Sequence, residues 1–151
     1  MTKITTTSKK GIDLIKSFEG CKLQAYNDPG TGGLPITIGW GNTTKEDGSK
    51  FKLGDKITQE RADALFLNLL PKFEKKVIDN ITVPLTQNQF DALVSFCWNC
   101  GYSSTLFSLI NTKASNETIY DWWISHYIKG GGKILKGLVR RRKAEANLYF
   151  A

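Results

Sequence analysis

Hydrophobic residues first recur at helical spacing, over residues 8–19. Ile12, Ile15 and Glu19 stand at i, i+3 and i+7, so one helix face carries two isoleucines and then a carboxylic acid. Ser8 is a favourable N-cap, and Gly20 is a favourable residue for ending the helix. We therefore expect Glu19 to lie in line with the buried stripe, although a solvated glutamate at a helix end is the ordinary alternative.

Alternating spacing follows in the next segments. Residues 23–26 predict a strand, residues 27–30 a turn and residues 36–41 a second strand. Alternation within the second strand predicts a core face formed by Ile36, Ile38 and Trp40. The opposite face carries one hydroxyl and two bare backbones, at Thr37, Gly39 and Gly41. Such a face is typical of a surface that a ligand approaches closely. A third strand is predicted over residues 48–53.

A long helical pattern begins at Thr58, which is a good N-cap followed by Glu60 in the first turn. Its apolar stripe consists of Ala62, Leu65, Phe66, Leu69, Phe73 and Val77. Pro71 falls inside this pattern, and a proline within a helix costs about 3 kcal/mol. We therefore predict a kink or a break near Leu70, in a segment that connects a β-containing lobe to a helical lobe.

The remaining sequence predicts helices only. Thr86 and Gln89 form a capping box before an apolar stripe, and Gly101 ends that helix. Further helices are expected over residues 104–111, from about residue 116, and over residues 138–149, with a flexible glycine loop at residues 129–133. The order of elements therefore predicts an α+β protein with a small β region and a larger helical region.

Length and composition fit one domain. The chain has 151 residues, of which 40% are hydrophobic, and no apolar run approaches the roughly 18 residues that a membrane span requires. Its first residues are polar and lack the apolar core of a signal peptide, so we expect synthesis and folding in a cytoplasm.

The cysteines do not indicate a disulfide framework or a metal site. Cys21, Cys97 and Cys100 are an odd number of thiols, and the CxxC spacing of the last two has no βαβ context. One histidine and three cysteines also make a poor set of zinc ligands. We expect no metal and no organic cofactor.

Positive charge is concentrated near the C-terminus. The net charge is +7, and between Lys129 and Lys143 there are seven cations and no acid. Such a segment is typical of binding to nucleic acid, anionic lipid or another anionic polymer, although a solvated helix face is an equally ordinary explanation. Glu145 can pair with Arg141 or Arg142 at helical spacing. No nucleic-acid motif accompanies the charge, so we expect no nucleic-acid partner, and contact with an anionic envelope stays an alternative for this segment.

The candidate chemistry lies in the early segment. Two carboxylates that face each other across a bound sugar are the minimum requirement for splitting a glycosidic bond. Glu19 at a helix end and Asp28 in a turn are such a pair, with the Thr37 hydroxyl on the following strand. Each also has an ordinary explanation, since aspartate before Pro-Gly is a frequent turn former.

Glu19, followed after eight residues by Asp28 and then by TIGWG at residues 37–41, resembles the active-site stretch of phage lysozymes, the endolysins of glycoside hydrolase family 24. Further matching motifs follow in order at residues 84–96, Asn99 with Gly101, residues 131–133 and residues 137–145. Together they extend from Gly11 to Tyr149. The chain departs from the family pattern in a longer loop over residues 29–35 and in Trp98, where relatives often carry phenylalanine.

The resemblance implies a single lysozyme-like domain over residues 1–151, with a cleft between its lobes. The expected lobes are a β-containing lobe at about residues 12–57 and a helical lobe at residues 81–151 together with the first helix. Residues 58–80 are the expected connecting helix.

The resemblance also implies hydrolysis of the β-1,4 bond between N-acetylmuramic acid and N-acetylglucosamine in peptidoglycan. By motif position, Glu19 is the general acid, Asp28 the second carboxylate and Thr37 the residue that helps to hold the attacking water. Release from the host cytoplasm through a holin pore and action on the wall as a monomer complete what the resemblance implies.

Three residues of the helical lobe are candidate substrate-binding residues: Trp98, Asn99 and Thr105. Trp98 is placed to stack on a sugar and Asn99 to bond an acetamido group, although a large aromatic at helical spacing is usually core. Two alternative functions stay open. A lytic transglycosylase cuts the same bond without a water-holding second carboxylate, and a basic binding protein would act through Lys129 to Lys143 alone.

Overall fold

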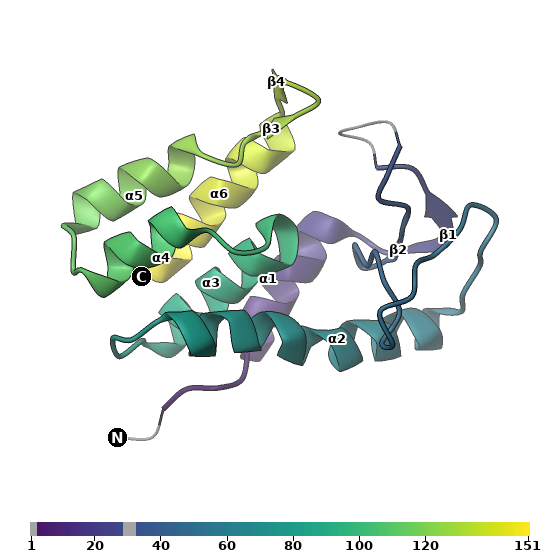
Figure 1. Ribbon diagram of the computed structural model, residues 1–151, viewed down its shortest axis with the longest axis horizontal. Coiled ribbons are helices and arrows are strands. Elements are labelled where there is room, and N and C mark those ends of the chain that lie inside the picture. Colours follow the sequence, from purple (N-terminus) through teal and green to yellow (C-terminus); the bar gives the residue numbers. More distant parts are fainter. Residues whose placement is uncertain (1–2, 29–32) are drawn as a thin grey trace. The chain divides into compact units, whose positions relative to one another are not determined.

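The computed structural model describes residues 3–28 and 33–151, and the chain divides into two compact units (Figure 1). The β-containing unit is Lys16–Pro71, and the helical unit is Met1–Ile15 together with Lys72–Ala151. The boundaries fall inside the first and second helices, α1 (Lys9–Glu19) and α2 (Gln59–Asn80). The division into one domain with the lobe limits expected from the sequence stays a prediction.

Two short strands form the sheet of the β-containing unit. β1 (Lys22–Tyr26) and β2 (Thr37–Gly39) pair antiparallel, with Tyr26 opposite Thr37 and an irregularity in the register between Lys22 and Tyr26. The predicted third strand over residues 48–53 is wrong, because this segment contributes only an isolated bridge between Thr44 and Lys50. Left-handed glycines at Gly48 (φ 86°) and Gly54 (φ 97°) turn the backbone before a ladder can extend.

The core of this unit lies between the strands, the following loop and α2. Its buried side chains are Ala25, Ile38, Phe51, Leu65 and Leu69, with Ile36 and Ile57 packed against them. The core face predicted for the second strand is therefore confirmed for Ile36 and Ile38. Trp40 is only partly buried and lies beyond the end of β2, so its assignment to that core face is wrong.

The ends of the first two helices match their predicted caps. α1 ends at Glu19 and is followed by Gly20 in the left-handed region (φ 65°). α2 begins after Thr58, whose hydroxyl accepts a hydrogen bond of 3.1 Å from the backbone N–H of Arg61. The helix continues through Pro71, so a break near Leu70 is wrong, whereas the kink stays a prediction. Pro71 is exposed, which keeps the disrupted turn on the solvent side of the helix.

Four helices and a small hairpin make up the rest of the helical unit. The helices are α3 (Gln87–Cys100), α4 (Ser104–Asn111), α5 (Asn116–Ser125) and α6 (Lys136–Tyr149). The predicted capping box at Thr86 and the stop at Gly101 (φ 79°) are both present. α6 packs against α3 and α5, and α4 packs against α5 (Figure 1).

The expected flexible loop at residues 129–133 is instead a hairpin. β3 (Lys129–Gly130) pairs antiparallel with β4 (Lys133–Ile134). Gly131 (φ 57°) and Gly132 (φ 79°) form the connecting turn. Two successive residues with positive φ suit the tight turn of a two-residue hairpin, so the glycines close a turn here.

A buried ion cluster joins α3, α5 and α6. Glu145 is fully buried and accepts hydrogen bonds from Ser95 Oγ (2.5 Å) and Trp123 Nε1 (3.2 Å). Its carboxylate also accepts from Arg141 Nε (3.3 Å) and from Arg142 Nε (2.7 Å) and Nη2 (3.0 Å). The predicted pairing of Glu145 with an arginine is thus confirmed for both candidates. The Glu145 carboxylate thus pairs with two buried guanidinium groups and links the three helices through its hydrogen bonds.

We predict that Glu145→Gln lowers the free energy of unfolding by about 3 to 5 kcal/mol, because it removes the negative charge that Glu145 supplies to two buried guanidinium groups. Denaturant unfolding followed by circular dichroism measures the change. The matched control is Glu117→Gln, which removes an exposed acid from the first turn of α5 and should cost only about 0.3 to 1 kcal/mol. Equal losses in the two variants would contradict the role given to the cluster.

Candidate active site

Glu19 lies at the end of α1, with its side chain against the turn that follows β2. A Cβ atom added to Gly41 would lie 2.3 Å from Glu19 Oε1 and 2.6 Å from Glu19 Cδ. Gly41 also has φ +81°, in the left-handed region that favours glycine. Backbone conformation therefore favours glycine at this position, and any side chain here would displace the Glu19 carboxyl, for which the bare backbone of Gly41 forms one wall.

Asp28 and Glu19 both act on the same neighbouring group, Tyr26. Burial raises the pKa of the Tyr26 phenol first, and the negative charges of Glu19 and Asp28 raise it further. Because Tyr26 pairs with Thr37 across the strands, the three residues predicted from the sequence are all grouped around one tyrosine. Tyr26 is thus a common neighbour of the helix end, the turn and the strand that carry the three candidate residues, and their joint catalytic role stays a prediction.

Thr37 and Asp28 are each fixed by a local hydrogen bond. Thr37 is 8% exposed, and its hydroxyl donates to the carbonyl of Pro35 over 3.0 Å. The backbone N–H of Asp28 donates to the carbonyl of Gly33 over 2.8 Å, which closes the connection between the strands. The longer loop that departs from the family pattern includes residues 29–32, which lie outside the described residues.

Tyr26 is a candidate site residue that the sequence pattern did not indicate. A signal for it existed, because Tyr26 stands two residues before Asp28 and residues two apart in an extended chain share a face. Tyrosine in a strand is ordinarily explained as packing, so alternation alone did not distinguish it. Its role becomes visible only when both carboxylates are placed near its hydroxyl.

The three candidate substrate-binding residues lie in the helical unit. Trp98 is 7% exposed, and its ring centroid lies 4.8 Å from that of Phe73, a placement that favours the core alternative. Asn99 is exposed near the end of α3, and Thr105 is exposed in the first turn of α4. Contact with substrate stays a prediction for all three residues.

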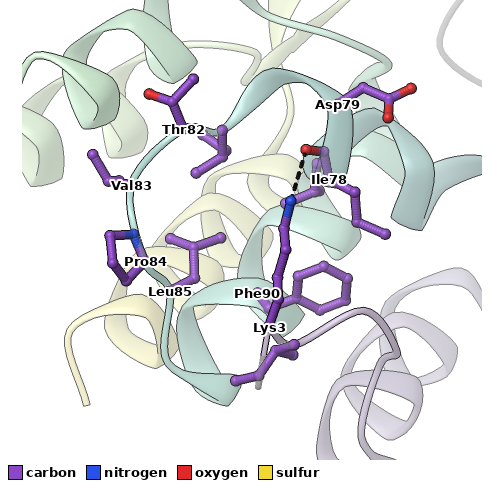
Figure 2. Close-up of a pocket in the computed structure, with 11 residues that line it drawn as sticks. Lys3, Ile78, Asp79, Thr82, Val83, Pro84, Leu85 and Phe90 are labelled. Carbon is purple, nitrogen blue, oxygen red and sulfur yellow. Dashed lines mark hydrogen bonds between the residues drawn. The ribbon is translucent and has the colours of Figure 1, made fainter. Parts of the chain in front are cut away.

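An apolar hollow of about 520 Å³ lies elsewhere in the helical unit (Figure 2). It is lined mainly by aliphatic and aromatic side chains, including Val83, Pro84 and Phe90. The Lys3 ammonium crosses it to reach the carbonyl of Ile78 over 3.5 Å. None of the site residues predicted from the sequence lines this hollow, and its lining does not supply the paired carboxylates of a hydrolytic site.

The thiols are poorly suited to redox chemistry. Burial raises the pKa of both Cys97 and Cys100 to about 12, so neither forms an appreciable thiolate near neutral pH. All three cysteines are free. In residues 3–28 and 33–151, no three histidine, cysteine or acidic side chains are grouped in a way that could hold a metal ion.

The basic segment divides into buried and exposed cations. Arg141 and Arg142 are buried against Glu145, so they add nothing to the surface. The exposed cations are Lys129, Lys133, Lys136, Arg140 and Lys143. The last three recur at i, i+4 and i+7 and therefore share one face of α6.

Comparison with known proteins identifies the family. The sequence profile of the phage lysozymes matches residues 16–145, which is most of the chain. The chain belongs to the phage lysozyme family. The chain is similar to an endolysin of Bacillus phage B103, to which it is 39% identical over 151 residues, covering 95% of this chain and 53% of that protein. The chain spans only about half the length of the first curated phage lysozymes that it matches.

Solved structures of this family confirm the α+β, lysozyme-like fold. An endolysin from Escherichia coli O157:H7 phage FAHEc1 superposes with a TM-score of 0.77 at 38% identity, over 99% of this chain and 96% of that one. The muramidase domain of SpmX from Asticaccaulis excentricus superposes with a TM-score of 0.74 at 36% identity, over 98% of this chain and 99% of that one. In the described parts of the chain, no helix is long and apolar enough to cross a lipid bilayer.

We predict that Gly41→Ala destabilises the protein more than Gly48→Ala. Both glycines have positive φ, so each substitution strains the backbone by about 1 to 2 kcal/mol. Only the alanine at position 41 also meets a side chain, that of Glu19, whose flexible end must move aside at a further cost of about 1 kcal/mol. Denaturant unfolding of the two variants measures the difference.

A double substitution isolates the contact itself. Adding Glu19→Ala to Gly41→Ala should recover the extra loss, while adding it to Gly48→Ala should recover nothing. Equal destabilisation by the two glycine substitutions, or no recovery in the double variant, would show that Gly41 does not define the position of Glu19.

Proposed function

We propose that this chain is an endolysin that hydrolyses the β-1,4 bond between N-acetylmuramic acid and N-acetylglucosamine in bacterial peptidoglycan. Membership of the phage lysozyme family and likeness to proteins named endolysin and muramidase domain support the substrate class. The observation that carries the proposal is the grouping of Glu19, Asp28 and Thr37 around Tyr26.

Glu19 is the general acid in this proposal. It protonates the oxygen of the glycosidic bond as the bond to the sugar carbon breaks, and the departing saccharide leaves as an alcohol. The turn at Gly41 gives the carboxyl one fixed wall, and a positioned acid is effective because proton transfer needs hydrogen-bond distance.

Asp28 and Thr37 serve the other half of the reaction. The Asp28 carboxylate stabilises the positive charge that develops on the sugar ring and orients the incoming water, and the Thr37 hydroxyl helps to hold that water. Water adds to the sugar carbon, its proton passes to a carboxylate, and a new reducing end forms. Asn99 and Thr105 are proposed contacts for the glycan because both are exposed polar residues.

Family membership also supports a proposal for the biological setting. We place synthesis in the host cytoplasm, release through a holin pore at the end of a phage cycle, and action on the wall as a monomer without a cofactor. The exposed cations of α6 and the β3–β4 hairpin suit contact with an anionic envelope. Binding of an anionic polymer through this basic surface is a second candidate function. It is favoured because Lys136, Arg140 and Lys143 lie on one face of α6.

Glu19→Gln tests the catalytic assignment and separates it from charge-driven binding. Glutamine keeps the shape of the side chain but supplies no acidic proton, so clearing of purified, outer-membrane-stripped cell walls should fall by roughly 10²- to 10⁴-fold. Co-sedimentation with the same walls should be unchanged, because the basic surface is intact.

Glu60→Gln is the matched control, since Glu60 is an exposed acid in the first turn of α2. It should clear walls at the wild-type rate. Clearing by Glu19→Gln at the wild-type rate would overturn the assignment of Glu19, and absence of clearing by the wild-type protein would favour a binding protein.

A further inference from the structure

The turn after β2 is closed by hydrogen bonds at both of its ends. Ile38 and Asn42 exchange backbone hydrogen bonds of 2.9 and 2.8 Å. The Asn42 side chain, which is 3% exposed, accepts a further bond of 3.2 Å from the backbone N–H of Trp40. Gly39 and Gly41 supply the left-handed conformations on either side of Trp40. Trp40 therefore stands at the tip of a rigid turn whose next residue touches Glu19.

The Trp40 ring is held by side chains from two helices. Its indole N–H donates to Asp63 Oδ1 of α2 over 2.8 Å. The Lys16 ammonium of α1 lies 4.8 Å from the centroid of the Trp40 ring and 5.0 Å from that of Phe66. We call Lys16, Trp40 and Asp63 the Trp40 cluster.

The acceptor in this cluster is a charged carboxylate with more than one donor. Gln59 Nε2 also donates to Asp63 Oδ1, over 3.0 Å. The hydrogen bond from Trp40, and then that from Gln59, lowers the pKa of the Asp63 carboxyl, with a smaller contribution from the positive charge of Lys16. Asp63 is therefore ionised near neutral pH, and hydrogen bonds to an ionised acceptor are stronger than neutral ones.

The Trp40 cluster and Glu19 belong to one closed circuit of contacts. Lys16 precedes Glu19 by three residues in α1, so both side chains lie on the same face of that helix. The Lys16 ammonium lies over the ring of Trp40. The next residue, Gly41, has its bare backbone against the Glu19 carboxyl. The turn is thus held to α1 through Trp40 and Lys16. Its next residue, Gly41, lies against the carboxyl of Glu19 at the end of the same helix.

We propose that Trp40 and Asp63 are positioning residues for Glu19. Their hydrogen bond fixes the turn that contains Gly41, and this turn fixes the position of the Glu19 carboxyl. Trp40 is only partly buried, so its hydrogen bond to Asp63 adds a directional constraint to the packing of its ring. This inference rests on the proposed hydrolysis of peptidoglycan by Glu19.

The test measures kcat and KM on purified peptidoglycan for Asp63→Ala, Asp63→Asn and Trp40→Phe. Asp63→Ala removes the acceptor, and Trp40→Phe removes the donor while keeping a ring beneath Lys16. A displacement of the acid of about 1 Å is enough to cost up to about a hundredfold in rate, so we expect kcat to fall at least about tenfold in both variants. KM should stay within about twofold, because neither side chain is placed on the substrate.

Two further results distinguish positioning from general damage to the fold. Asp63→Asn keeps an amide oxygen in the same place and should restore most of kcat. The double variant Trp40→Phe/Asp63→Ala should be no slower than either single variant, because both remove the same hydrogen bond. Glu60→Ala, one turn earlier on α2, is the control and should leave kcat unchanged.

A crystal structure of Asp63→Ala gives a readout that does not depend on activity, and it should show the Gly41 turn and the Glu19 carboxyl displaced by about 1 Å. An unmoved Glu19, an unchanged kcat, or losses that add up in the double variant would overturn the proposal. If the wild-type protein does not cleave peptidoglycan, the proposed function fails, and the crystal structure still decides whether the pair positions Glu19.

Discussion

The close approach of the Gly41 backbone to the Glu19 carboxyl is the contact on which the β-containing unit depends. A methyl group at Gly41 would overlap the carboxyl oxygen, and φ +81° independently disfavours a side chain there. The neighbouring elements are arranged to hold this approach: α1 ends at Glu19, β2 ends one residue before Trp40, and Asn42 closes the turn. Tyr26 links the candidate residues, because the charges of Glu19 and Asp28 both raise the pKa of its phenol and Thr37 lies opposite it in the sheet.

A glutamate that matters to the structure is found in each unit, and the two differ in burial and in their neighbours. In the helical unit, Glu145 is fully buried and accepts hydrogen bonds from a hydroxyl, an indole and two guanidinium groups, so its charge is committed to joining three helices. In the β-containing unit, Glu19 is partly buried and lies against bare backbone. Because Arg141 and Arg142 are buried against Glu145, they do not contribute to the basic surface. The exposed face of α6 is the main part of that surface.

The sequence pattern correctly predicted the features that depend on neighbouring residues in the chain. The stop at Gly20, the capping box at Thr86 and the pairing of Glu145 with arginine each depend on residues within one helical turn. What the sequence pattern missed depends on contacts between distant segments. Trp40 fitted the alternation of a core strand, yet its indole bonds to Asp63, 23 residues away. Tyr26 resembled an ordinary strand residue until both carboxylates were placed near it, and the glycines at residues 131–132 predicted flexibility although they close a hairpin turn.

The central claim is that Glu19 and Asp28 together carry out hydrolysis, with water as the acceptor of the glycosyl group. Mass spectrometry of muropeptides released from purified peptidoglycan by the wild-type protein tests it directly. The account predicts fragments that each contain one added water and end in a reducing N-acetylmuramic acid. Fragments that end in a 1,6-anhydro ring, or in a reducing N-acetylglucosamine, would contradict it.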